Sequence, residues 1–124
     1  YGVNAMELLI NRCMQNGADR RRLEAKVFGG GHVLKSRLHA DSVPNRNIVF
    51  ALSFLEMEGI PIRTRDTGGY AARSILFFTD TGKVLLKRLS ETGSSSVQIA
   101  EIERLEEQTA ATLPKPDDEN ITLF

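Results

Sequence analysis

The sequence predicts an α+β protein in which helices and a mixed sheet form a layered sandwich. Two segments place apolar residues at helical spacing, and four others show the alternation or the continuous apolar runs of strands. The expected helices span about residues 4–16 and 47–58, and the expected strands span 23–28, 60–66, 74–79 and 83–89. With 124 residues, 41% of them hydrophobic and 26% charged, the chain has the size and composition of one globular core.

The first helix opens with a pattern of the capping-box type, Asn4 followed three residues later by Glu7. An apolar stripe follows, made of Met6, Leu9, Ile10, Cys13 and Met14. Gly17 is expected to end the helix. Cys13 lies inside the stripe with no histidine near it in the sequence. We therefore expect a core thiol rather than a nucleophile.

Leu23 to Gly31 is a predicted strand that runs into a glycine loop. Three glycines follow Phe28, and glycine allows backbone angles and close approaches that other residues do not. The loop matches neither the dinucleotide fingerprint nor the P-loop, because His32-Val33-Leu34-Lys35 comes next. It is therefore either a tight structural turn or a loop that binds a ligand.

Residues 32–45 show no clear period and are expected to form an irregular surface loop. His32 and His39 in this loop are either solvated or a general base, with no nucleophile close to them in the sequence. The second helix is expected to begin at Asn47 and to end near Glu58, before Gly59. Its apolar residues lie on both faces, so it must be covered on two sides.

The next strand alternates from Ile60 to Asp66, and Pro61 places it at a sheet edge or marks its beginning. Asp66-Thr67-Gly68-Gly69 is then expected to be a turn that carries a carboxylate. Residues 74–79 and 83–89 are continuous apolar runs joined by Asp80-Thr81-Gly82. They predict a hairpin whose strands are buried on both faces.

The pattern changes after residue 89, which divides the chain into a domain of residues 1–89 and an extension of residues 90–124. A Gly/Ser connector, an acidic helix over about residues 97–109 and a disordered, flexible tail are expected there. The last four residues, Ile121-Thr122-Leu123-Phe124, are apolar. They either fray or dock, by adding a strand or by filling a pocket.

The formal net charge is zero, which gives no reason to expect nucleic acid as a partner. The charge is uneven, since residues 1–88 carry 14 Lys/Arg against 8 Asp/Glu and residues 89–124 carry 2 against 8. One cysteine and two histidines provide no internal disulfide and no metal-ligand spacing, so neither a metal nor another cofactor is expected. No apolar run is long enough for membrane insertion, and a cytoplasmic setting is expected.

Several segments occur in the order found in a known family. They are Tyr1-Gly2, Asn4-Ala5-Met6, Leu9-Ile10-Asn11, Gly17-Ala18, Leu23, Ala25-Lys26-Val27-Phe28-Gly29-Gly30, Arg46-Asn47, Gly59-Ile60-Pro61-Ile62, Asp66, Gly68-Gly69 and Thr81-Gly82-Lys83-Val84. In these segments the chain resembles the chemoreceptor glutamine deamidases, the CheD family of bacterial chemotaxis. The resemblance runs from Tyr1 to about Leu89 and leaves residues 90–124 outside it.

The resemblance implies an enzyme that hydrolyses the side-chain amide of receptor glutamines to glutamate and releases ammonia. In the family a cysteine thiolate attacks the amide carbon, and a histidine serves as base and then as acid. The family's Gly-Ser-Cys and His-x-x-Leu-Pro motifs do not occur in these 124 residues. We therefore assign no catalytic residue here and expect the family's Cys and His upstream of Tyr1.

Two interpretations follow from the missing motifs. The chain is either a fragment of a deamidase, with its catalytic part upstream, or a non-catalytic module that binds chemotaxis partners. The resemblance implies methyl-accepting chemoreceptors as the substrate and the CheC phosphatase as a partner. The residues expected to line a substrate or partner cleft are Phe28, Gly29, Gly30, Gly31, Asp66, Gly68, Gly69 and Arg73. Tight turns with a surface salt bridge are the alternative for these residues.

Overall fold

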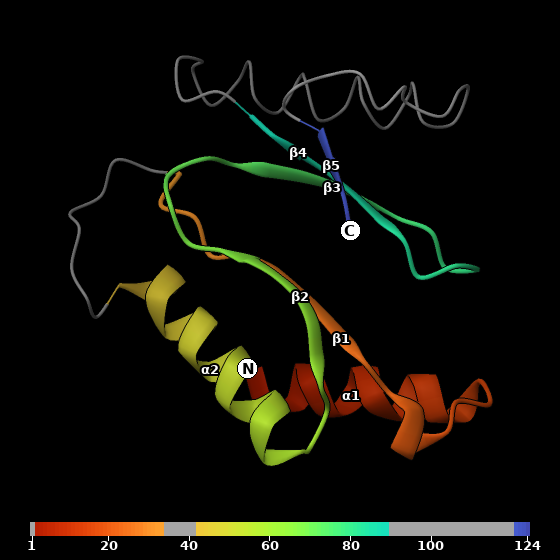
Figure 1. Cartoon of the computed structure of the whole chain (residues 1–124). Coiled ribbons are helices and arrows are strands. Elements are labelled where there is room, and N and C mark those ends of the chain that lie inside the picture. The colour runs from red at the N-terminus through yellow and green to blue at the C-terminus, as the bar shows by residue number, and fades with distance from the viewer. Residues whose placement is uncertain (1, 34–41, 90–120) are drawn as a thin grey trace. The chain divides into compact units, whose positions relative to one another are not determined.

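A computed structural model describes residues 2–33, 42–89 and 121–124 (Figure 1). The chain divides into two compact units, and each is described by itself. The first unit comprises Tyr1–Gly31 and Ser36–Gly69, and the second comprises His32–Lys35 and Tyr70–Phe124. Helices occur in the first unit and antiparallel strands in the second, which confirms the predicted α+β class. None of the helices in the described ranges is long and apolar enough to cross a membrane.

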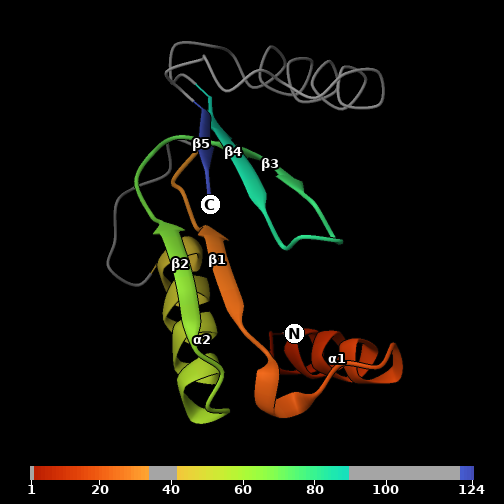
Figure 2. The same ribbon diagram turned by 45° about the vertical axis from the view of Figure 1, so that its right-hand side comes forward.

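The first unit contains a strand, a helix and a second strand parallel to the first. Its elements are α1 (Gly2–Gln15), the 3₁₀ helix η1 (Arg20–Arg22), β1 (Ala25–Gly29), α2 (Val43–Met57) and β2 (Ile62–Thr67). The strands pair in parallel, with Lys26 opposite Thr64 and Gly29 opposite Thr67. Figure 2 shows α2 lying along one face of this pair. A connection through a helix is what a parallel pair of consecutive strands requires.

Both helix C-termini lie where the glycines predict them. Gly17 has φ +94° after α1, and the amide of Ala18 donates to the carbonyl of Cys13 at 3.0 Å. Gly59 has φ +68° after α2, and the amide of Ile60 donates to the carbonyl of Leu55 at 2.9 Å. Because glycine adopts positive φ without a steric penalty, each one closes the last turn of its helix.

The predicted N-termini of the two helices were wrong. α1 begins at Gly2, before the expected cap at Asn4. α2 begins at Val43, not at Asn47, and its N-cap is Ser42, whose hydroxyl accepts from the amide of Asn45 at 3.5 Å. Pro44 indicated a loop in the sequence, but it occupies the first turn of α2, where the missing N–H has no intrahelical role.

Much apolar surface of the first unit is exposed. Among its described residues only Leu55 and Ile60 are buried hydrophobic residues. α1 buries none of its residues, and Leu9 of the predicted stripe is 61% exposed. α2 leaves Met57 87% exposed, although its two apolar faces predicted cover on both sides. The described chain therefore covers only part of the surface that its pattern marks for burial.

The second unit is a three-stranded antiparallel sheet. It consists of β3 (Arg73–Phe77), β4 (Val84–Arg88) and β5 (Ile121–Leu123), in the order β3-β4-β5. The β3–β4 pair confirms the predicted hairpin. Burial on both faces was wrong for β3, because Ile75 and Phe77 are 45% and 58% exposed. β4, the central strand, carries the core residues Val84 and Leu86.

The chain's last residues are ordered as a strand. Ile121–Leu123 forms β5 beside β4. Of the three alternatives for this segment, which were fraying, strand addition and filling a pocket, the structure shows strand addition. The expected connector, acidic helix and most of the expected tail lie outside the described residues, as do residues 34–41 of the predicted loop. The division at residue 89 stays a prediction.

Candidate functional site

The two glycine loops of the first unit meet at the C-terminal ends of its parallel strands. Phe28 lies opposite Asp66, and the amide of Gly68 donates to the carbonyl of Gly29 at 2.9 Å. Loops that follow the carboxyl ends of parallel strands are common positions for ligand sites. The structure thus brings together residues that are almost forty positions apart in the sequence and were predicted to share a cleft.

Gly30 has a packing role in this loop. Its φ is +68°, and a Cβ at this position would overlap the side chain of Ile48 in α2. The same Cβ would lie 3.4 Å from the carbonyl oxygen of Pro44. Glycine is therefore required both by the backbone conformation and by the close approach of α2.

Gly29 and Gly69 differ from Gly30, because a Cβ on either would meet no atom within 4 Å. Their φ values are +115° and +70°, so their conformations still favour glycine. Open space beside Gly29 and Gly69 leaves room for another chain to approach the backbone. The two glycine loops together thus contain one packed position, Gly30, and two open ones, Gly29 and Gly69.

Seven of the eight predicted cleft residues belong to the first unit, and Arg73 belongs to the second. Arg73 is half-buried, and its Nη1 donates to the carbonyl of Ala71 at 3.5 Å. Burial lowers the pKa of Arg73 from its ordinary value. It lies opposite Arg88 on β4, which places two guanidinium groups on neighbouring strands.

Within either unit, the described residues do not include both a cysteine and a histidine. Cys13 is a free, half-buried thiol on α1 in the first unit, so full burial in a core was not observed. His32 belongs to the second unit, where its ring centroid lies 6.2 Å from that of Tyr70. His39 lies outside the described residues. In the described ranges, no group of three or more His, Cys, Asp or Glu side chains could hold a metal ion.

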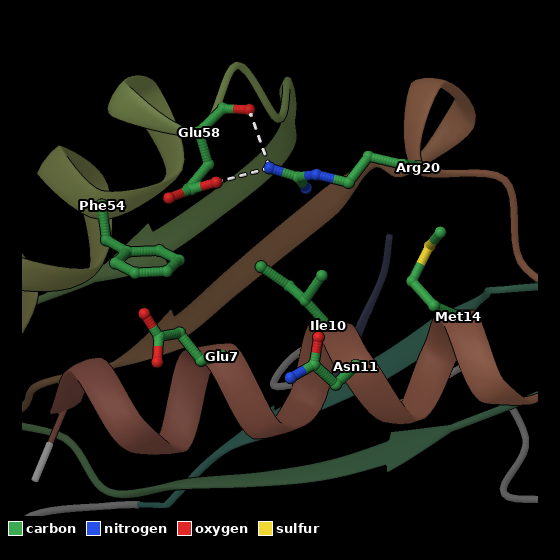
Figure 3. A pocket seen from close by; sticks show the side chains of 7 residues that line it. All are labelled: Glu7, Ile10, Asn11, Met14, Arg20, Phe54 and Glu58. Atoms are coloured by element: carbon green, nitrogen blue, oxygen red, sulfur yellow. Dashed lines mark hydrogen bonds and ion pairs between the residues drawn. The ribbon is translucent and has the colours of Figure 1, made fainter.

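A pocket of about 490 Å³ opens between α1, η1 and the end of α2 (Figure 3). Arg20 spans its rim, and its Nη2 donates to the carboxylate of Glu58 and, at 3.3 Å, to the carbonyl oxygen of the same residue. Nη1 of Arg20 is buried and makes no hydrogen bond within the described part of the chain. The residues that line the pocket are Glu7, Ile10, Asn11, Met14, Arg20, Phe54 and Glu58.

Several side chains in the lining of this pocket can form hydrogen bonds. Asn11 can donate and accept, Glu7 can accept, and the unused Nη1 of Arg20 can donate to a carbonyl or carboxylate oxygen. Its lining contains neither a thiol nor an imidazole, so it has no nucleophile and base for attack on an amide. Sequence reasoning missed the pocket, because Arg20 and Glu58 are 38 residues apart and neither belongs to a motif.

Comparison with known proteins shows what the chain as a whole is similar to. The family model described as CheD chemotactic sensory transduction matches residues 1–88. A "Probable chemoreceptor glutamine deamidase CheD 2" from Chromobacterium violaceum is 49% identical over 98 residues, which are 79% of this chain and 48% of that protein. A "Probable chemoreceptor glutamine deamidase CheD" from Bordetella petrii is 45% identical over 112 residues, 90% of this chain and 50% of that protein.

A third relative, from Laribacter hongkongensis and with the same name as the Bordetella protein, is 42% identical over 97 residues. The match covers 78% of this chain and 47% of that protein. The chain therefore spans about half the length of the curated relatives it matches.

Proposed function

Because this chain belongs to the CheD family, we propose that it forms part of a chemoreceptor glutamine deamidase. The reaction is hydrolysis of a glutamine side-chain amide on a methyl-accepting chemoreceptor, which leaves glutamate and releases ammonia. The observation that carries the proposal is the family match over residues 1–88, together with relatives that bear this name.

The part assigned to this chain is the substrate cleft, not the chemistry. Gly29 and Gly69 leave open space beside the backbone where a receptor segment can approach. Asp66 can accept a hydrogen bond from an amide N–H₂ at the end of β2. Attack on an amide needs a thiolate and a base within hydrogen-bond reach, and we assign these to a Cys and a His outside these 124 residues.

Ammonia release from a glutamine-bearing receptor fragment tests whether this chain supplies the substrate cleft and other residues supply the chemistry. We expect no ammonia from the 124-residue chain alone and ammonia from a longer protein that joins it to a relative's remaining half. Cys13→Ala in the longer protein is the control, and it should leave the rate unchanged because Cys13 belongs to α1 and not to β1, β2 or the glycines that follow them. Activity of the isolated chain that disappears in Cys13→Ala would contradict the assignment.

Partner binding without chemistry is the second candidate. Met57 is 87% exposed and Val49 63% exposed on α2, which is apolar surface of the kind that protein partners cover. The CheC phosphatase is the partner that this candidate names. A longer protein that releases no ammonia from any receptor fragment yet binds CheC in calorimetry would favour this candidate over the deamidase.

A further inference from the structure

The pocket between α1, η1 and the end of α2 lies wholly within the first unit (Figure 3). Its volume of about 490 Å³ is within the usual range for ligand pockets, about 300–1,000 Å³. The residues that α1 contributes have the spacing of one helix face, and they are Glu7, Ile10, Asn11 and Met14. Glu7 and Met14 are about two turns apart, roughly 10 Å along the helix, which is the length of about three residues of extended chain. The pocket is therefore long enough for a short peptide segment.

The lining of the pocket has an excess of negative charge. It contains two carboxylates, Glu7 and Glu58, and one guanidinium, Arg20, which is paired with Glu58. The carboxylate of Glu7 makes no ion pair or hydrogen bond within the described part of the chain. This excess is local, because residues 1–88 as a whole carry 14 Lys/Arg against 8 Asp/Glu. Glu7 therefore attracts a cationic group on a ligand.

Arg20 presents a hydrogen-bond donor that is not used. Its Nη2 donates to the carboxylate and to the carbonyl oxygen of Glu58, which fixes the guanidinium at the border of the pocket. Its Nη1 is buried and has no partner among the described residues, and an unpaired buried donor is unfavourable. A main-chain carbonyl oxygen satisfies such a nitrogen without adding negative charge to the lining. Asn11 and Met14, which line the same pocket, are exposed, so their side chains can rotate to admit the oxygen.

We propose that this pocket binds an extended segment of a partner protein in which a basic residue and an apolar residue are two positions apart. Side chains two positions apart point to the same side of an extended chain, so both can enter the pocket. The basic side chain pairs with Glu7, and the apolar side chain packs against Ile10 and Phe54, which are half-buried. A carbonyl oxygen of the segment accepts from Nη1 of Arg20. This binding does not depend on the deamidase function.

A peptide titration followed by NMR tests the proposal with the full 124-residue chain. The probe is acetyl-Leu-Gly-Lys-Gly-Leu-amide, which has an apolar residue two positions from its lysine in either chain direction. We expect chemical-shift changes at the residues that line the pocket. A control peptide with glutamate in place of the lysine should bind roughly tenfold more weakly, because it places a like charge beside Glu7. Equal affinity of the two peptides, or no shift changes in the lining, would overturn the proposal.

Charge exchange in the protein supplies a matched pair of variants. Glu7 is exposed, so Glu7→Lys should fold, and it should reverse the preference by favouring the glutamate peptide over the lysine peptide. Glu56→Lys makes the same change in charge at an exposed position of α2 outside the lining. It should change neither affinity by more than about twofold. An equal effect of both substitutions would indicate general charge attraction rather than a site, and it would contradict the proposal.

Arg20→Lys tests the unused donor. Lysine keeps a positive charge that can pair with Glu58, but it offers no second terminal nitrogen. The lysine peptide should therefore bind roughly tenfold more weakly to this variant. Thermal unfolding checks that the variant is folded, and if it is not, the comparison of Glu7→Lys with Glu56→Lys still decides. Unchanged affinity in folded Arg20→Lys would refute the contact between Nη1 and the ligand.

Discussion

Replacing Gly30 by alanine tests whether the loop needs glycine at this position for close packing as well as for its backbone conformation. Gly30 has φ +68°, and an added Cβ would overlap Ile48 of α2. Gly69 is a matched control, because its φ is +70° and a Cβ there meets no atom within 4 Å. Gly30→Ala therefore combines a backbone penalty with an overlap, and Gly69→Ala has the backbone penalty alone.

The expected loss in the free energy of unfolding is the sum of the backbone penalty and the overlap penalty. A non-glycine residue in the left-handed region costs about 1–2 kcal/mol, which is the expected loss for Gly69→Ala. Overpacking adds roughly 1–3 kcal/mol, so Gly30→Ala should lose about 2–5 kcal/mol of the free energy of unfolding. Ile48→Ala removes the side-chain atoms that the new Cβ would overlap. In the double variant the overlap term should disappear, and the losses should be less than additive by roughly 1–3 kcal/mol.

Urea unfolding followed by circular dichroism measures all four proteins. Equal destabilisation by Gly30→Ala and Gly69→Ala would refute the packing argument, and so would strict additivity with Ile48→Ala. If Gly30→Ala does not fold, recovery of folded protein in the double variant still reports the overlap. A structural role established in this way assigns Gly30 to packing and distinguishes it from Gly29 and Gly69, where a Cβ would meet no atom within 4 Å.

Three further changes test other parts of the chain. The hydrogen bond that Arg63 donates to Glu24 at 2.8 Å holds the pKa of Glu24 below its ordinary value of 4.5. The Glu24 carboxylate therefore stabilises the folded chain at pH values above 4.5, and this stabilisation is lost as the pH falls through the lowered pKa. Melting temperatures of Glu24→Gln and the unchanged chain should therefore differ slightly at neutral pH and converge in acid. Leu86→Ala, at a fully buried position, should cost about 2–5 kcal/mol in urea unfolding, and Leu85→Ala, at a half-buried one, clearly less. Arg20→Met should lose about 1 kcal/mol or less of the free energy of unfolding at low salt, and less still at high salt, because both side chains of its ion pair with Glu58 are more than a third exposed.

The sequence correctly predicted those helix ends and turns that depend only on residues adjacent in the chain. Gly17 and Gly59 end their helices as expected, since a positive φ after the last turn is a property of glycine itself. The hairpin of β3 and β4 likewise follows from two apolar runs with a short turn between them. Pro44 misled the prediction, because proline signals a break inside a helix and is favourable in its first turn. Which case applies depends on the cap that precedes it, here Ser42.

Contacts between distant residues could not be predicted in the same way. The convergence of Gly29 with Gly68 depends on the parallel register of β1 and β2, which no single segment encodes. The pairing of Arg20 with Glu58 depends on where η1 meets the end of α2. Seven of the residues expected to line a cleft do lie in one unit, at the ends of β1 and β2, because glycines and an aspartate often follow strands where parallel strands expose their loops. That they line a cleft stays a prediction.

The exposure of the first unit connects its fold to its proposed function. Parallel sheets normally have both faces covered and more strands than two, and an isolated pair of strands is marginally stable. β1 and β2 form such a pair, and the described residues of their unit include only two buried hydrophobic side chains. A protein about twice as long, as the matched relatives are, has further chain with which to cover this surface. Under the proposed function, the same association is also what would have to bring the assigned Cys and His to the glycine loops.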